Sequence, residues 1–123
     1  MILWLDLETY SDIPIANGVY KYAEKCEILL FSWAINDDPV SVVDVASGEQ
    51  LPDALRAALL NPAVTLCAHN SNFDRTILRK VYGDVVGNPD RWIDTMILAL
   101  SVGLPGSLAE LCSVLQIPQD KAK

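Results

Sequence analysis

The first eight residues constrain the fold more than any other segment of this chain. Residues 2–5 are an apolar run that is typical of a buried strand, and Asp6 and Glu8 follow it. Side chains at positions i and i+2 of a strand point to the same side, so the two carboxylates share one face. Buried carboxylates cost free energy unless a cation compensates them. The segment predicts either half of a site for Mg²⁺ or Mn²⁺, or a strand that runs out into solvent.

A second polar segment precedes a predicted helix in the middle of the chain. A strand is expected at Ala63–Ala68 and a helix at Asn72–Tyr82, where apolar residues recur at helical spacing. Asp74 falls in the first turn of this helix. Ser71 and Asp74 also fit a capping box, and an acid in the first turn complements the helix dipole. A structural role for Asp74 is therefore an open alternative to a role in a site.

Together the two segments resemble the first two motifs of the DEDD superfamily of 3′-to-5′ exonucleases. In that family D-x-E-T ends the first strand and N-x-x-[FY]-D opens a helix. This chain has Asp6-Leu7-Glu8-Thr9 and Asn70-Ser71-Asn72-Phe73-Asp74 at those places. Weaker sequence matches to the family lie at Trp92–Thr95 and Ser107–Leu111. Within the family, the sequences of residues 8–11 and 18–23 are similar to those of exonuclease domains attached to phage-type DNA polymerases.

The resemblance implies an α/β fold, namely a DnaQ-like, RNase H-like mixed sheet flanked by helices. The residue pattern agrees with this order of elements. Besides the segments above, it predicts a first strand over residues 2–8, strands at Glu27–Asn36 and Val40–Val45, a helix at Leu51–Leu60, a loop at Gly83–Pro89, a helix from Asp94 to Val102 and a last helix capped by Ser107. Trp4, Phe31, Trp33, Cys67 and Cys112 are expected in the core.

One part of the family pattern is missing from the sequence. The third motif, a His or Tyr followed by a fourth acidic ligand, should come after the helix that begins at Ser107. Asp120 does not fit it, because Pro118-Gln119 precedes it rather than a helix with His or Tyr. We therefore expect residues 1–123 to be the N-terminal part of an exonuclease-like domain. As a C-terminally incomplete chain without the third-motif helix, it should be inactive or nearly so.

The resemblance also implies roles for particular residues. Asp6, Glu8 and Asp74 would be the catalytic and metal-binding residues, holding two Mg²⁺ or Mn²⁺ ions about 4 Å apart. The general base, His or Tyr, would come from the missing segment. The substrate-binding residues would be Thr9, Asn70 and Phe73.

Three neighbouring residues have structural alternatives. Phe73 could stack on a terminal base or pack on the sheet, and packing is the favoured interpretation. His69 is interpreted as a structural residue beside the site rather than as a catalytic one. Asp94 is expected to cap the helix that follows it, with at most a supporting role at the site.

The implied function is metal-dependent 3′-to-5′ exodeoxyribonuclease action on single-stranded DNA ends, in proofreading or linked to a phage-type DNA polymerase domain or subunit. The formal net charge of −7 argues against a broad basic surface, so DNA binding by the chain alone should be weak. The sequence has no apolar run of about twenty residues and no apolar leader, so a membrane role is not expected, and the location would be the cytoplasm of a bacterium or phage-infected host. A chain of this length buries only a small hydrophobic core, so its stability is expected to depend on self-association.

Two other classes of protein share parts of this pattern. A haloacid-dehalogenase-type phosphatase also begins with carboxylates after an apolar strand, but it needs Asp where this chain has Glu8. A catalytically silent RNase H-like domain that only binds a partner stays open, because the fourth ligand is absent. The three cysteines form no C-x-x-C pair, so neither a disulfide framework nor a thiolate zinc site is indicated.

Overall fold

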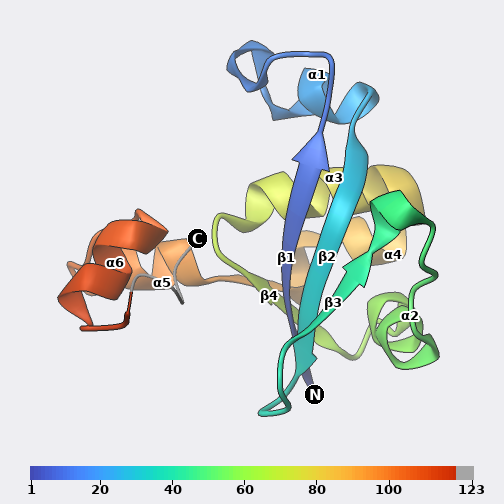
Figure 1. Ribbon diagram of the computed structural model, residues 1–123. Coiled ribbons are helices and arrows are strands. Elements are labelled where there is room, and N and C mark those ends of the chain that lie inside the picture. Colours follow the sequence, from blue (N-terminus) through green and yellow to red (C-terminus); the bar gives the residue numbers. More distant parts are fainter. Residues whose placement is uncertain (119–123) are drawn as a thin grey trace.

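A computed structural model describes residues 1–118 of the chain (Figure 1). The strands are β1 (Ile2–Tyr10), β2 (Glu27–Ile35), β3 (Ser41–Asp44), β4 (Thr65–Ala68) and β5 (Trp92–Asp94). The helices are α1 (Val19–Glu24), α2 (Asp53–Leu60), α3 (Ser71–Tyr82), α4 (Asp84–Gly87), α5 (Thr95–Ser101) and α6 (Leu108–Val114). Short 3₁₀ turns lie at η1 (Ile15–Asn17), η2 (Val45–Ser47) and η3 (Pro89–Arg91).

The strands form one mixed sheet in the order β3-β2-β1-β4-β5. β1, β2 and β3 are joined as an antiparallel meander, whereas β4 runs parallel to both β1 and β5. The parallel pairs need crossover connections, and α2 and α3 lie in these connections. The predicted mixed sheet flanked by helices is confirmed.

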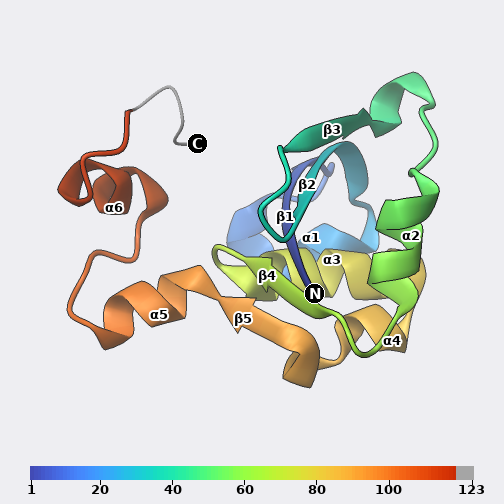
Figure 2. The same ribbon diagram turned by 90° about the horizontal axis from the view of Figure 1, so that it is seen from below.

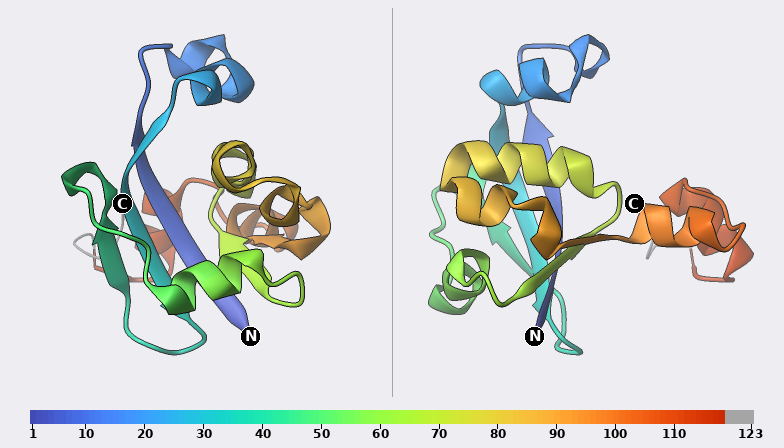
Figure 3. Two further views of the ribbon diagram at one scale, coloured as in Figure 1. Left: turned by 90° about the vertical axis from the view of Figure 1, so that its right-hand side faces the viewer. Right: turned by 180° about the vertical axis from the view of Figure 1, so that it is seen from behind.

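The core lies between one face of the sheet and the helices α2, α3 and α4 (Figure 3). Every second side chain of β1 faces this core, since Leu3, Leu5 and Leu7 are buried. In the antiparallel register Leu7 lies opposite Phe31, which is fully buried. The alternation of β1 therefore decides which of its residues are left for the other face.

The other face of the sheet is not covered by a helix in the described part of the chain (Figures 1 and 3). Trp4 belongs to this face and is 42% exposed, so its expected core position is wrong. It lies opposite Ala34 and next to Asp6, two residues along the same strand. Val42 of β3 is exposed as well. Acidic and apolar side chains thus share the open face.

The last two helices extend beside the sheet rather than over it (Figure 2). α5 begins where β5 ends, and several large apolar side chains in and just after α5 and α6 are exposed. They are Ile97, Leu98, Leu100, Val102, Val114, Leu115 and Ile117. Cys112 of α6 and Cys67 of β4 are buried, as expected.

A buried arginine joins three parts of the core. Arg91 is only 5% exposed, and its guanidinium group donates to four backbone carbonyls. Two of these carbonyls, on Ala58 and Leu59, belong to the C-terminal end of α2, where the helix dipole is negative. The others belong to Val64 and Val85, before β4 and in α4. Burial lowers the pKa of Arg91.

Most predicted elements lie within two residues of their observed bounds; the exceptions are α1, for which no range was predicted, α4 and β5. The predicted loop over residues 83–89 contains α4, and β5 was not predicted as a strand. β5 has only three residues, which is too short for an alternating pattern to show, and its pairing with β4 defines it. Asp120, which does not fit the third motif, lies outside the described residues. None of the helices within residues 1–118 is long and apolar enough to span a membrane.

Candidate active site

The candidate site lies where β4 stops and β1 continues. β4 pairs with β1 only from Ile2 to Trp4, so beyond this point β1 has no paired strand on that side. The N-terminal turn of α3 lies against this free edge, and the carboxylate of Asp74 accepts a hydrogen bond from the backbone N–H of Leu7. Asp74 is only 3% exposed. The end of one short strand therefore makes room for a buried carboxylate beside β1.

The environment of Asp74 strongly favours its protonated form. Burial is the largest cause, and the negative charge of Asp6 is the second; together they raise the pKa of Asp74 from 3.8 to about 8. The hydrogen bond from Leu7 acts in the opposite direction but does not offset them. The structure thus brings Asp6 and Asp74 together, although 68 positions (74 − 6) separate them in the sequence. A buried carboxylate whose pKa is raised by burial and by a neighbouring negative charge is a common feature of functional sites.

Glu8 shares the outward face of β1 with Asp6, and both side chains are exposed. The register between β1 and β2 shifts between Glu8 and Thr9, where Leu30 and Ile28 are their partners. Such a bulge bends the strand and re-aims its side chains. The strand nevertheless continues to Tyr10, two residues beyond the predicted end.

The three predicted metal ligands are not gathered as a ready ligand group. Within residues 1–118, no three His, Cys, Asp or Glu side chains are placed to hold a metal ion. The pair of Asp6 and Asp74 is supported by their electrostatic interaction, whereas the place of Glu8 in a metal site stays a prediction. The donor chemistry still fits hard cations, because all three residues offer carboxylate oxygens.

Asp94 holds the N-terminus of α3 in place. Its carboxylate accepts from the backbone N–H of Asn70 (2.9 Å), from the N–H (2.8 Å) and hydroxyl (3.1 Å) of Ser71, and from the N–H of Met96 (2.9 Å). Desolvation raises the pKa of Asp94, but these hydrogen bonds outweigh it and keep the pKa below its ordinary value. Asp94 caps α5 as predicted and also binds the first residues of α3.

This arrangement corrects the capping interpretation of Asp74. The N-cap of α3 is Asn70, in the left-handed region at φ 60° and without a side-chain cap, and the N–H of Ser71 binds Asp94 instead. Asn tolerates this conformation better than most residues. Asn70 is exposed, so its predicted contact with a substrate remains open. The carboxylate of Asp74 accepts hydrogen bonds from the backbone N–H of Leu7 on β1 and from its own backbone N–H, and it forms no capping box with Ser71.

Tyr22 of α1 connects the two motifs, a role that was not predicted, although residues 18–23 contribute to the family resemblance. Its hydroxyl is 3.0 Å from the hydroxyl of Thr9, which follows Glu8. Its ring lies 5.8 Å from the ring of Phe73, which precedes Asp74, and Ser11 donates to its backbone carbonyl at 2.8 Å. Phe73 also packs against the core, which supports the packing interpretation. Tyr22 therefore ties the end of β1 to the start of α3.

We expect Tyr22→Phe to lower the free energy of unfolding by about 1 kcal/mol, because it removes only the partly buried hydrogen bond to Thr9. Urea unfolding of the chain measures this change. Tyr20→Phe is the matched control, since Tyr20 is 68% exposed. Equal stability of the two variants would show that the bond to Thr9 contributes nothing.

His69 occupies a structural position at the end of β4. Its Nδ1 lies 2.9 Å from the hydroxyl of Thr95, and its Nε2 lies 2.6 Å from the carbonyl of Gly106. Both ring nitrogens are thus used to hold the start of α5 and the turn before α6. These contacts support the structural interpretation of His69.

Comparisons with known proteins place this geometry in context. No protein-family model matches the chain. The DNA polymerase of Bacillus phage SP02 is 38% identical over 124 residues, which cover 98% of this chain and 19% of that polymerase. The chain thus spans about a fifth of the length of this relative.

Solved nuclease structures share the fold. Escherichia coli RNase D, an exoribonuclease involved in structured RNA processing, superposes with a TM-score of 0.64 at 22% identity over 93% of this chain and 27% of its own. Brucella melitensis NrnC with bound Mg²⁺ gives a TM-score of 0.66 at 20% identity over 94% of this chain and 53% of its own. At these identities the likeness establishes the arrangement of the sheet and helices.

Proposed function

Because the chain has the DnaQ-like, RNase H-like fold of DEDD-type exonucleases, we propose that it is the exonuclease domain, in whole or in part, of a phage-type DNA polymerase. Its reaction is the hydrolysis of the 3′-terminal phosphodiester of single-stranded DNA, with release of nucleoside monophosphates. The preference for DNA rests on the similarity to a phage DNA polymerase along nearly the whole chain. RNase D, in contrast, is an exoribonuclease.

The observation that carries the proposal is the buried Asp74 beside Asp6 at the free edge of β1. A protein that only needed a stable core would lose stability by placing two carboxylates there. A divalent cation bound between them would offset this cost and favour the ionised forms. The arrangement is therefore better explained by ion binding than by folding.

Asp6, Glu8 and Asp74 would hold Mg²⁺ or Mn²⁺, and the fold neighbour NrnC has been solved with bound Mg²⁺. When bound, such ions supply an activated water and neutralise charge on the leaving oxygen. Because Glu8 is exposed on the same face as Asp6, its side chain can turn toward a bound ion. The proposal requires this movement, since the three carboxylates are not gathered within the described residues.

Three further residues would handle the DNA end. Thr9 follows Glu8 at the bulge, where its backbone can meet the terminal sugar. Asn70 is exposed next to the first turn of α3 and can donate to a phosphate or a sugar. Phe73 would support the terminal base from beside Tyr22, or serve only in packing. Asp94 would keep these groups in place through α3.

We further propose that a helix from a longer protein covers the open face of the sheet. Trp4 and Val42 are exposed on this face next to the acidic residues. A helix there would bury apolar surface and could bring a fourth carboxylate and a His or Tyr base to the site. On this proposal residues 1–123 form the N-terminal part of the domain and have little activity alone. Self-association through the same surface is the alternative.

The test compares the chain with the same chain continued to the length of its polymerase relatives. Single-stranded DNA is labelled at its 3′ or 5′ end and incubated with Mn²⁺ or with excess chelator. We expect the longer protein to release the 3′ label at once and to shorten 5′-labelled strands stepwise, only with the metal. The 123-residue chain should show almost no turnover.

Four outcomes would contradict parts of this proposal. Equal activity in chelator would exclude the metal-dependent reaction. Early release of the 5′ label would reverse the polarity, and faster degradation of an RNA strand of the same sequence would change the substrate class. Comparable turnover by the two proteins would show that no further segment is needed.

A second function is a catalytically silent RNase H-like binding domain. The absence of a gathered three-residue ligand group within residues 1–118 favours it. The two functions differ in a direct measurement, because a silent domain would bind no Mn²⁺ at millimolar concentration in a paramagnetic-resonance titration. The exonuclease proposal requires binding that Asp6→Ala weakens.

A further inference from the structure

In the described part of this acidic chain, the accessible positive charge is concentrated on and beside two helices. Seven Lys and Arg residues lie within residues 1–118; Arg91 is buried and Arg56 lies on α2. The other five lie on α1, directly after it or on α3: Lys21, Lys25, Arg75, Arg79 and Lys80. α1 and α3 are in contact (Figure 1). With a net charge of −7, such a concentration is not expected from composition alone.

A surface hollow of about 370 Å³ lies between these two helices. Arg75, Arg79 and Lys80 of α3 line one side, and Tyr20 and Glu24 of α1 line the other. Asp84 lies at the end of the hollow. The three basic residues outnumber the two acids, so the hollow is weakly positive.

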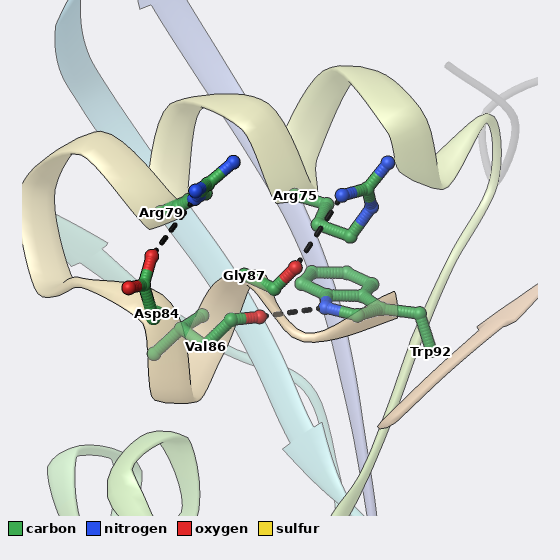
Figure 4. Close-up of polar contacts among 6 residues, drawn as sticks. All are labelled: Arg75, Arg79, Asp84, Val86, Gly87 and Trp92. Atoms are coloured by element: carbon green, nitrogen blue, oxygen red, sulfur yellow. Dashed lines mark hydrogen bonds and ion pairs between the residues drawn. The ribbon is translucent and has the colours of Figure 1, made fainter. Parts of the chain in front are cut away.

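The two arginines are one helical turn apart, and their side chains lie on the same side of α3 (Figure 4). Arg75 donates to the carbonyl of Gly87 at 3.3 Å and to Oδ1 of Asn72 at 3.1 Å. Both acceptors are neutral, so they orient the guanidinium group without cancelling its charge. Arg79 pairs with Asp84 at 3.0 Å, but the two side chains are 58% and 89% exposed. Such a surface pair is weak and can give way to a phosphate.

Tyr20 adds an aromatic surface to the hollow. Tyr20 is 68% exposed, whereas Tyr22, two residues along α1, packs against the core. Binding sites for single-stranded nucleic acid combine a positive groove with aromatic rings on which bases stack. Tyr20 and the basic residues of α3 provide both parts within one hollow.

The hollow and the candidate active site share the helices α1 and α3. Arg75 directly follows Asp74 on α3. Tyr22 of α1 packs on Phe73, which directly precedes Asp74 on the same helix. Lys80 is six residues beyond Asp74, about 9 Å along the helix axis. A strand whose end reaches Asp74 is therefore within a few nucleotides of the hollow.

We propose that this hollow between α1 and α3 binds single-stranded nucleic acid beyond its terminal nucleotide. Arg75, Arg79 and Lys80 contact backbone phosphates, and Tyr20 stacks on a base. The inference deepens the proposed function and rests on it. Because only three basic side chains take part, binding is weak. The logarithm of the binding constant should fall with the logarithm of the salt concentration with a slope of about −2.

The test measures binding without cleavage, using fluorescence anisotropy of labelled DNA and the 123-residue chain in excess chelator. The matched variants are Lys80→Glu in the hollow and Arg56→Glu on α2, which reverse the same charge at exposed positions. For an oligonucleotide of about ten residues, we expect Lys80→Glu to weaken binding at least threefold and to lower the salt slope by about one. Tyr20→Ala should weaken it about fivefold. Arg56→Glu should change binding much less.

A labelled dinucleotide separates the hollow from the candidate site. A dinucleotide is too short to reach both the candidate active site and the hollow. Lys80→Glu should therefore bind it as the wild-type chain does. Equal losses for Lys80→Glu and Arg56→Glu, a loss that is the same for dinucleotide and long strand, or no binding by the wild-type chain would each overturn the inference. Hydrolysis by the longer protein with unchanged binding in the variants would overturn the inference but leave the proposed function standing.

Discussion

Asp74→Asn is expected to stabilise the 123-residue chain at about pH 9 while it abolishes hydrolysis by the longer protein. Asn has nearly the same shape as the protonated acid and can still accept the hydrogen bond from Leu7. It carries no charge, so it does not repel Asp6 and cannot help to hold a divalent cation. Loss of such a ligand should reduce activity by about a thousandfold or more.

The pH dependence of this effect follows from the raised pKa. Asp74 ionises near pH 4 in the unfolded chain and at about 8 in the folded chain. Between these values the folded state binds more protons, so the free energy of unfolding falls as the pH rises and falls no further above pH 8. The total loss is on the order of 5 kcal/mol, and Asp74→Asn avoids it. The variant and wild type should therefore have equal stability near pH 4 and differ most near pH 9.

Urea unfolding in chelator across this pH range measures the effect, with Asp90→Asn as the control at an exposed acid. Parallel curves for wild type and Asp74→Asn would show that Asp74 has an ordinary pKa. Addition of Mn²⁺ at pH 8 should stabilise the wild type and leave Asp74→Asn unchanged, because ligand binding to the folded state adds stability. Stabilisation of both proteins would place the metal elsewhere.

The sequence predicted the fold well wherever local pattern decides the structure. The apolar alternation of β1 placed Asp6 and Glu8 on one face, and the helical spacing after Asn70 placed Asp74 in a first turn. That Asp6 and Asp74 meet could not be derived from spacing, because it depends on β4 ending beside the middle of β1. The family resemblance supplied this contact.

The residues that sequence reasoning missed act through tertiary contacts. Tyr22 lies on a short helix with no pattern that points to Thr9 or Phe73. Asp94 was correctly predicted as the cap of α5, but its bonds to Asn70 and Ser71 depend on the pairing of β4 with β5. Trp4 was placed in the core by its apolar character, although the alternation of β1 puts it beside Asp6 on the open face. In each case a neighbour distant in sequence decided the outcome.

The role of Arg91 also depends on tertiary contacts that the sequence does not indicate. The segment Asn88-Pro89-Asp90-Arg91 has a composition typical of an exposed loop. Arg91→Met is expected to lower the free energy of unfolding by about 3–5 kcal/mol. Methionine fills a similar volume but donates no hydrogen bond, so the carbonyls of Ala58, Leu59, Val64 and Val85 lose a buried partner. For a domain whose total stability is about 5–15 kcal/mol, this loss would unfold much of the protein at 37 °C.

Arg79→Met is the matched control, since it removes an arginine from an exposed ion pair and should cost less than about 1 kcal/mol. Arg91→Lys separates charge from geometry. A lysine keeps the positive charge near the C-terminal end of α2, but its single ammonium group cannot reach carbonyls from three elements at once. We therefore expect Arg91→Lys to lose most of the stability that Arg91→Met loses, as measured by the urea midpoint. If Arg91→Lys lost no more stability than Arg79→Met, the charge rather than the four directed hydrogen bonds would hold α2 to β4. This contact fixes the position of β4, the strand whose end creates the candidate site.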